Sequence, residues 1–181
     1  MVEKEIVSGA YDTDGNLVCE FMKEDMEKGE VYNGSVFLTK GVSEEDIKKI
    51  VMIQLPKDIC FIRNGAFEYC SSLREVYFPE GLIKIGKGVF WGCDSIETIV
   101  LPNSIKEIDD WAFAYCRSLK TVILPKNIIK IRNSVFENCT ALDMIIYDDM
   151  VYTNREKIRI KWKENEVDIG TSLFLRTNFE L

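Results

Sequence analysis

Cysteine is the residue with the widest chemical repertoire in this chain, because a thiolate can form a disulfide, bind zinc or attack a substrate. Six cysteines occur, and four of them recur at a fixed spacing of 23 residues. The four are Cys70, Cys93, Cys116 and Cys139. No C-x-x-C pair is present, which argues against a zinc site. The chain also has no histidine, which excludes Ser-His-Asp catalysis, Cys-His catalysis and every metal motif built on histidine.

Acidic residues near the N-terminus offer a candidate calcium loop. Asp12, Asp14 and Asn16 have the alternating spacing of calcium ligands. The EF-hand pattern also needs D-x-D-x-D-G and a glutamate six residues after the glycine. Here Gly15 directly follows the second aspartate, and Phe21 stands where the glutamate is required. We therefore interpret Asp14-Gly15 as a hairpin turn rather than a metal site.

Two acidic pairs, Asp109-Asp110 and Asp148-Asp149, are the remaining candidates for acid–base chemistry. Adjacent residues of a coiled chain do not converge as two catalytic carboxylates must. We interpret both pairs as exposed acids in turns. The sequence thus predicts no catalytic residue, no metal and no cofactor, and we do not expect an enzyme.

The spacing of the cysteines belongs to a repeat that includes many other positions, and a fixed period in this range marks a stacked repeat architecture. A phenylalanine precedes each of the four cysteines by three residues: Phe67, Phe90, Phe113 and Phe136. All the prolines of the chain share one column, Pro56, Pro79, Pro102 and Pro125, which follows Leu55, Phe78, Leu101 and Leu124. Further apolar columns are Ile62, Ile85, Ile108 and Ile131; Leu73, Ile96, Leu119 and Leu142; and Val76, Ile99, Val122 and Ile145.

These columns predict the elements of one coil. Val76 and Phe78 alternate, as the inward residues of a strand do. The proline that follows ends the strand, because it has no N–H to donate to a ladder. A second short extended piece holds Ile85. Phe90 and Cys93 are three residues apart, which places both on one side of a predicted short helix.

The pattern resembles the leucine-rich repeats of the BspA-like family, whose units read roughly L-x-x-I-x-I-P-x-x-V-x-x-I-G-x-x-A-F-x-x-C-x-x-L. The resemblance covers about residues 51–148, where four full units stand in register. Departures are small: the glycine is kept at Gly86 but is replaced by Arg63, Asp109 and Arg132. The resemblance implies a curved α/β solenoid, with a parallel β-sheet on the concave side and short helices on the other. It also implies protein–protein binding, often at microbial surfaces.

The repeat gives the cysteines a structural interpretation. Four of them occupy the same inward position and therefore behave as small buried hydrophobic residues. Stacked neighbours lie roughly 5 Å apart, but their parallel side-chain vectors suit a disulfide poorly. We predict free thiols. Cys19 and Cys60 lie outside the column, and the pattern assigns them no role.

Residues 1–50 are expected to form an N-terminal cap of hairpins and a degenerate repeat. Asp14-Gly15 and Asn33-Gly34 are hairpin turn signals. Ser43 followed by three acids predicts the start of a helix that runs to about Ile50. An atypical, polar end repeat is what the solubility of a solenoid requires.

Residues 149–181 also lose the period and are expected to form a C-terminal cap that pairs with or covers the last sheet edge. Val151 and Tyr152 come first. Ile158, Ile160 and Trp162 then alternate with basic residues, which predicts a half-exposed strand. Ser172–Leu175 is a further candidate strand.

Composition limits the partners. The net charge of −7 at pH 7 argues against nucleic acid and anionic membranes, because both attract basic patches. No apolar run approaches the ~20 residues of a membrane helix. The first ten residues lack the apolar core of a signal peptide. The expected location is therefore cytoplasmic if Met1 is the native start, and secreted or at the cell surface if a leader was removed.

The strand residues between the inward ones are expected to point to the concave face. One such column is Gln54, Tyr77, Val100, Ile123 and Ile146, and the adjacent column ends at Met144. A solvated strand face is normally polar, so an apolar stripe here would be an anomalous patch. We predict that it consists of the partner-binding residues Tyr77, Val100, Ile123, Met144 and Ile146. The alternative is that the C-terminal cap, or a second copy of the protein, covers the stripe.

Aromatic residues near the predicted helices form a second candidate contact site. Trp91 and Tyr115 follow core phenylalanines by one and two positions, which suggests the convex face. The alternative is that they pack between neighbouring coils, the usual environment of such large side chains.

The sequence therefore predicts a non-catalytic, protein-binding leucine-rich-repeat module, either adhesin-like or an interaction scaffold. A protein partner is expected, whose identity the residues do not reveal. The alternative is a structural or self-assembling solenoid in which the apolar stripe is a homo-oligomer interface.

Overall fold

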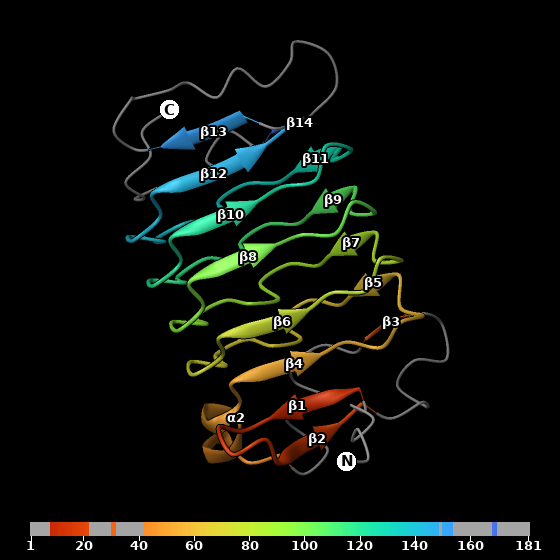
Figure 1. Cartoon of the computed structure of the whole chain (residues 1–181), viewed down its shortest axis with the longest axis vertical. Coiled ribbons are helices and arrows are strands. Elements are labelled where there is room, and N and C mark those ends of the chain that lie inside the picture. The colour runs from red at the N-terminus through yellow and green to blue at the C-terminus, as the bar shows by residue number, and fades with distance from the viewer. Residues whose placement is uncertain (1–7, 22–29, 32–41, 149, 154–167, 170–181) are drawn as a thin grey trace, which may run out of the picture.

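The computed structural model describes residues 8–21, 30–31, 42–148, 150–153 and 168–169. They form a β-solenoid of about four turns, with the coils stacked along the long axis of Figure 1. Each full coil has three edges. The first carries a longer strand, the second a two-residue strand and the third a series of turns.

The longer strands lie on the first edge, and their register follows the 23-residue repeat. They are β4 (Met52–Gln54), β6 (Glu75–Tyr77), β8 (Thr98–Val100), β10 (Thr121–Ile123) and β12 (Met144–Tyr147). β4 pairs in parallel with β6, and β8, β10 and β12 pair in parallel with one another. The inward residues of these strands follow the alternation of side chains in a strand and pack in the core: Ile53, Val76, Ile99, Val122 and Ile145.

The second edge is a parallel ladder of two-residue strands. It contains β3 (Glu30–Val31), β5 (Phe61–Ile62), β7 (Lys84–Ile85), β9 (Glu107–Ile108), β11 (Lys130–Ile131) and β14 (Asp168–Ile169). All six strands belong to one continuous sheet. The isoleucines of β5, β7, β9 and β11 are fully buried, so the column that the sequence predicts is confirmed as core.

The third edge differs from the sequence prediction, because its segments are turns and not short helices. Two positions in each coil have positive φ, for example Trp111 (55°) and Tyr115 (60°). Alternate amides of these turns bond the next coil: Phe90 N donates to Ala112 O at 2.8 Å. An α-helix would need negative φ throughout and would keep these amides for its own carbonyls. The prediction failed because the (i, i+3) spacing of Phe and Cys also fits a series of tight turns.

A stack of phenylalanine rings forms the centre of the core. Phe67, Phe90, Phe113 and Phe136 are at most 1% exposed. Successive ring centroids lie 5.5, 5.2 and 5.7 Å apart, with the planes 24°, 8° and 15° from parallel. Each stacked pair of rings can contribute roughly 0.5–1.5 kcal/mol of stability beyond the contribution from burying apolar area. The predicted core column is thus confirmed.

The described N-terminal residues contain a hairpin and one helix. β1 (Gly9–Tyr11) pairs antiparallel with β2 (Leu17–Glu20) and with β4. The predicted turn at Asp14-Gly15 joins β1 to β2. It is closed by Asp12, whose side chain accepts from Asn16 N at 2.8 Å. The Asn33-Gly34 hairpin lies outside the described residues.

The predicted helix start at Ser43 is confirmed. Helix α2 (Glu44–Lys49) has Ser43 as its N-cap, whose hydroxyl accepts a hydrogen bond from Asp46 N at 3.1 Å. Acids fill its first turn and lysines its last, which complements the helix dipole. The helix ends at Lys49, with Ile50 as its C-cap, one residue before the predicted end.

At the other end, β13 (Met150–Thr153) pairs antiparallel with β12 in the register Ile146–Val151. Tyr152 is buried against the core. The predicted strand around Ile158–Trp162 and the candidate strand Ser172–Leu175 lie outside the described residues.

Candidate functional site

The outward residues of the first edge form a surface that we call the stripe face, defined by Tyr77, Val100, Ile123, Met144 and Ile146. Tyr77 is 49% exposed and Val100 56% exposed. Ile123, Met144 and Ile146 are half-buried. Val100 pairs with Ile123 and Ile123 with Ile146, so these three aliphatic side chains stand side by side on successive strands.

Polar groups flank the apolar part of the stripe face. The Tyr77 hydroxyl donates to Glu75 Oε2 at 2.8 Å. This hydrogen bond to the carboxylate, together with its negative charge, raises the pKa of Tyr77 above its ordinary value. The tyrosine therefore remains a neutral hydrogen-bonding group at physiological pH.

A groove of about 830 Å³ lies over β6 and β8. Its lining comes from the β6 segment, the β8 segment and one residue of the next coil: Arg74, Glu75, Val76, Tyr77, Ser95, Glu97, Thr98, Val100 and Ser118. Two predicted stripe residues, Tyr77 and Val100, therefore share one concavity. Ile123, Met144 and Ile146 lie beyond its lining.

The groove coincides with a break in the β-sheet that the repeat does not predict. β6 ends one four-stranded sheet and β8 ends another, and the two strands are not hydrogen-bonded to each other (Figure 1). Within the described chain, all other neighbouring strands on this edge from β2 to β13 are paired. Sequence reasoning missed this break, although the column Leu55, Phe78, Leu101 and Leu124 carries a signal for it, since Phe78 interrupts a run of leucines.

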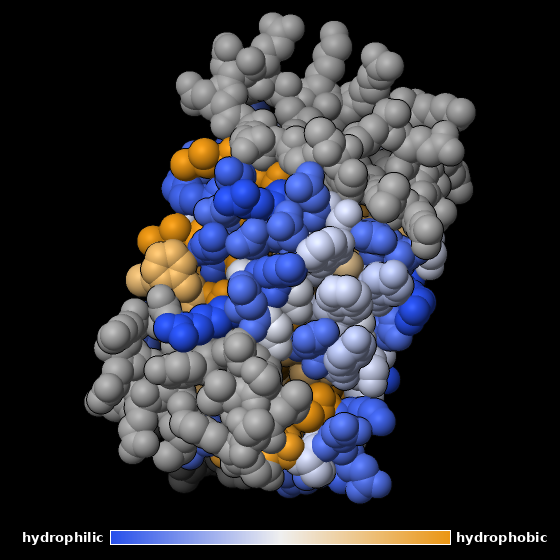
Figure 2. All heavy atoms as spheres, turned by 180° about the vertical axis from the view of Figure 1, so that it is seen from behind, coloured by the Kyte–Doolittle hydropathy of each residue, from blue (hydrophilic) through white to orange (hydrophobic). Residues whose placement is uncertain are grey.

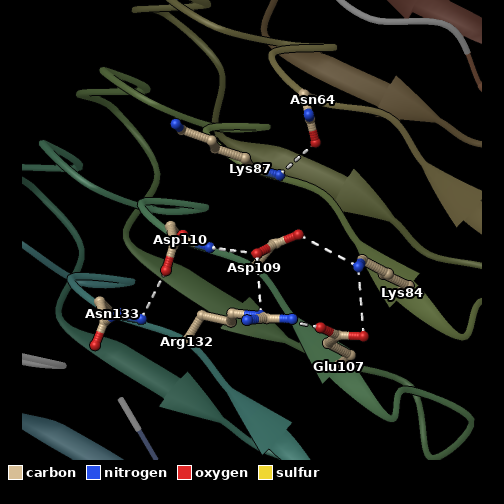
Figure 3. Close-up of polar contacts among 8 residues, drawn as sticks. All are labelled: Asn64, Lys84, Lys87, Glu107, Asp109, Asp110, Arg132 and Asn133. Atoms are coloured by element: carbon tan, nitrogen blue, oxygen red, sulfur yellow. Dashed lines mark hydrogen bonds and ion pairs between the residues drawn. The ribbon is translucent and has the colours of Figure 1, made fainter. Parts of the chain in front are cut away.

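The second edge carries a charged network that contrasts with the stripe face. Lys84 Nζ lies 3.3 Å from Glu107 Oε2 and 3.3 Å from Asp109 Oδ2. Arg132 Nε lies 3.1 Å from Glu107 Oε1 and 3.4 Å from Asp109 Oδ1 (Figure 3). Seen from behind, a band of hydrophilic residues crosses the described part of the molecule (Figure 2).

The acidic pair Asp109-Asp110 belongs to this region, and its residues are half-buried rather than exposed as predicted. Asp109 is held in the network, whereas Asp110 accepts from Asn133 N at 2.9 Å, as Asn64 accepts from Lys87 N two coils earlier (Figure 3). The two carboxylates therefore serve the stacking of coils and do not converge.

A family model for BspA-type leucine-rich repeat regions matches six copies of its repeat over residues 45–158. The chain belongs to this family. BspA-type repeat regions and other leucine-rich repeats generally mediate protein interactions and generally have no catalytic activity. The sequence-based recognition of the family is confirmed.

Solved bacterial repeat proteins are similar to this BspA-type chain in fold. A leucine-rich cell surface protein from Faecalibacterium prausnitzii A2-165 has a TM-score of 0.53 and 36% identity, over 54% of this chain and 26% of that one. A leucine-rich repeat protein of T. pallidum has a TM-score of 0.53 and 32% identity, over 54% of this chain and 46% of that one. The chain thus spans less than half of the length of either protein. No curated protein matches the chain.

The repeated cysteines of this BspA-type chain belong to the core. Cys70, Cys93, Cys116 and Cys139 are buried free thiols, and Cys93 Sγ donates to Phe67 O at 3.2 Å. Burial raises the pKa of the Cys70 thiol to about 12 and that of Cys93 well above its ordinary value. A thiol with so high a pKa stays protonated and is a poor nucleophile and metal ligand. Cys19 is half-buried and its Sγ donates to Glu20 O at 3.4 Å, and Cys60 is a half-buried free thiol.

The described part of this BspA-type chain contains no group of three or more Cys, Asp or Glu residues that could hold a metal ion. Among the same residues, we find no helix whose length and apolar character would let it cross a membrane.

The aromatic residues of the third edge pack between coils, as the second interpretation predicts. Trp91 stacks on Tyr115 with 5.6 Å between ring centroids and 6° between planes. The Trp111 indole N–H donates to Glu137 Oε2 at 3.1 Å. Tyr69 is 61% exposed and lines a groove of about 620 Å³ with Trp91 and Tyr115. The third edge therefore has an aromatic surface as well as inter-coil packing.

Proposed function

We propose that this chain is a non-catalytic protein-interaction module that binds its partner through the stripe face, on the concave side of the solenoid. The observation that carries the proposal is the exposure of Tyr77 and Val100 beside one groove. Exposed apolar side chains gathered on one face often mark interaction sites. The residues proposed to contact the partner are Tyr77, Val100, Ile123, Met144 and Ile146.

The energetics favour the aliphatic part of the stripe face as an anchor. Fully covering one aliphatic side chain contributes about 1.5–3 kcal/mol. Val100, Ile123 and Ile146 lie on adjacent strands, so one partner surface can cover all three. A few such anchors usually account for most of the binding free energy of an interface.

An adhesin-like role is the form of this function that we favour. Its support is the solved relative described as a cell surface protein. The partner is then a protein encountered outside the cell, and this chain provides one repeat segment of the adhesive surface. Self-assembly through the same stripe is the competing use, because a self-complementary aliphatic stripe can join two copies.

The test compares two double variants, each of which introduces two glutamates in two different coils. V100E/I123E changes the stripe face. I83E/I129E is the matched control, because Ile83 and Ile129 are 40% and 55% exposed and precede the short strands β7 and β11 of the second edge. Each protein is applied to an array of purified extracellular proteins, after circular dichroism and thermal unfolding have shown that it is folded.

We expect some targets to bind the wild type and I83E/I129E with similar affinity but to bind V100E/I123E at least tenfold more weakly. A tenfold loss of affinity corresponds to about 1.4 kcal/mol of binding free energy. Unchanged binding by V100E/I123E would move the site to another surface. Unfolding of V100E/I123E alone would show that the stripe is core. Size-exclusion chromatography with light scattering separates the two uses of the stripe, since a concentration-independent monomer argues for an external partner.

A further inference from the structure

The break between β6 and β8 leaves main-chain groups unpaired in the middle of the stripe face. At the next junction, Thr121 N donates to Glu97 O at 3.1 Å and Leu101 N donates to Ile123 O at 3.0 Å. The equivalent bonds between β6 and β8 would join Thr98 N to Arg74 O and Phe78 N to Val100 O. Among the described residues neither of these bonds forms.

Only the first edge is open at this junction. On the second edge β7 and β9 remain paired, and Lys106 N donates to Ile83 O at 2.8 Å. On the third edge Ser95 Oγ donates to Ser71 O at 2.7 Å. The two coils are therefore held together along the second and third edges and separated along the first.

Phe78 is the residue that distinguishes this junction. It occupies the column that holds leucine in the other three repeats, and its ring meets Phe90 edge-on with 5.9 Å between centroids. A phenyl ring in place of leucine adds volume between two closely packed coils, and a packed core accommodates added volume by shifting backbone. Because the other two edges are tied, the first edge is where the coils separate.

The opening also uncovers apolar surface. Val76, the inward residue of β6, is half-buried, whereas its equivalents in the other coils are buried: Ile53, Ile99, Val122 and Ile145. The floor of the groove therefore offers an apolar side chain together with free N–H and C=O groups from two strand edges. Tyr77 and Val100 stand on either side of it.

We infer that the groove between β6 and β8 binds an extended, strand-like segment of a partner protein. The partner's main chain hydrogen-bonds the unpaired groups of Thr98, Phe78, Arg74 and Val100, and one of its apolar side chains covers Val76. The inference rests on the proposed function, because it names the kind of partner that the stripe face takes.

An extended chain is the occupant that the unpaired groups select. When a partner covers the groove, these main-chain donors and acceptors lose their contact with water and need partners, and strand edges find them in another strand. A helix has its main-chain groups already bonded internally, so it could cover Tyr77 and Val100 but would leave the strand edges unpaired. A strand supplies donors and acceptors at the spacing of the sheet and alternating side chains at once.

Phe78→Leu is the variant that tests whether Phe78 separates β6 from β8, because it introduces the leucine that the other three repeats have at this position. Amide hydrogen exchange of the full chain provides the first measurement. In the wild type, the amides of Thr98 and Phe78 should exchange at least tenfold faster than those of Thr121 and Leu101, and in F78L this difference should disappear. Equal protection at all four amides in the wild type would overturn the inference.

The second measurement uses a library of random seven-residue peptides selected on the wild-type protein after depletion on F78L. We expect selected peptides that are rich in β-branched residues, lack proline, and bind F78L at least tenfold more weakly. Methylation of alternate backbone nitrogens in a selected peptide should also weaken binding at least tenfold, because it removes main-chain donors and keeps every side chain.

Three further outcomes would overturn the inference: no peptide distinguishes the wild type from F78L, N-methylated peptides bind equally well, or the wild type forms a dimer that F78L does not. The last would make a second copy the occupant. If the protein targets of the wild type bind F78L normally but not V100E/I123E, the proposed function stands and only the strand-like partner is lost.

Discussion

The two β-ladders of this solenoid are built by the same coils in the same register, yet only one of them is continuous. The ladder of two-residue strands runs from β3 to β14 without interruption, whereas the ladder of longer strands stops at β6 and begins again at β8. The repeat therefore determines register, while individual residues within a column determine whether neighbouring coils close.

The contacts at the continuous ladder explain why it stays closed. Gly86 N donates to Ile62 O at 2.8 Å, and Gly86 approaches Asn64 of the preceding coil so closely that a Cβ at Gly86 would lie 2.7 Å from Asn64 Oδ1. One coil later the charged network of Lys84, Glu107, Asp109 and Arg132 bridges three successive coils (Figure 3). The stripe face has no comparable tie between β6 and β8 among the described residues.

Both ladders depend on the stack of phenylalanines, so its removal should have the largest effect. Phe113→Ala deletes a ring that is 0% exposed and stacked on both sides. The expected loss in the free energy of unfolding is about 3–5 kcal/mol, from lost burial and the cavity that remains. Denaturant unfolding measures it.

Phe61→Ala is the matched control for Phe113→Ala, since Phe61 is 37% exposed. It should cost much less than the core substitution, because less apolar surface is lost from water. A loss below ~1 kcal/mol for Phe113→Ala would show that this register of the core is wrong.

The continuous ladder should be sensitive to a single methyl group at Gly86. In Gly86→Ala the new Cβ would lie 2.7 Å from Ile62 O, which is backbone and cannot rotate away. The two coils must separate locally, at a cost of about 1–3 kcal/mol. Thermal unfolding, together with faster exchange of the Gly86-neighbouring amides, would detect the new opening.

Gly81→Ala is the matched control, because its Cβ would come no closer than 3.8 Å to Ile59 O or Lys57 O. A small gain of roughly 0.4–1 kcal/mol is expected there, from the reduced freedom of the unfolded chain. Equal effects of the two substitutions would mean that close approach at Gly86 does not hold the ladder together.

Much of this architecture could be predicted from the sequence, because the columns repeat. The inward positions, the strand register, the free cysteines and the helix start at Ser43 all follow from spacing and local chemistry. The third edge was predicted wrongly as helices, because Phe90 and Cys93 have the same three-residue separation in a tight turn as in a helix. Positive φ at residues such as Trp111 and Tyr115 is not encoded by a residue type that favours it.

The candidate site was only partly predictable for a related reason. Alternation along the strands predicts which residues face outward, and Tyr77 and Val100 are indeed exposed. The break beside them depends on how the larger ring of Phe78 is accommodated against Phe90, which is a packing outcome rather than a pattern. A single departure in an otherwise uniform column was the available signal.

The smallest effect is expected where charges, rather than packing, distinguish the two edges. Glu107→Gln removes the charge that pairs with Arg132 at 3.1 Å and Lys84 at 3.3 Å across the closed ladder. Because the Glu107 side chain is only 25% exposed and belongs to a network, we expect the melting temperature to fall by about 1–3 °C.

Glu97→Gln is the matched control, since Glu97 and its partner Lys120 are both more than half exposed, and it should change the melting temperature by less than about 1 °C. Repeating both measurements at about 1 M salt should shrink the difference, because the screening length then falls to about 3 Å. A larger effect of Glu97→Gln would mean that the exposed pair on the first edge, and not the network on the second, does more to hold the coils together.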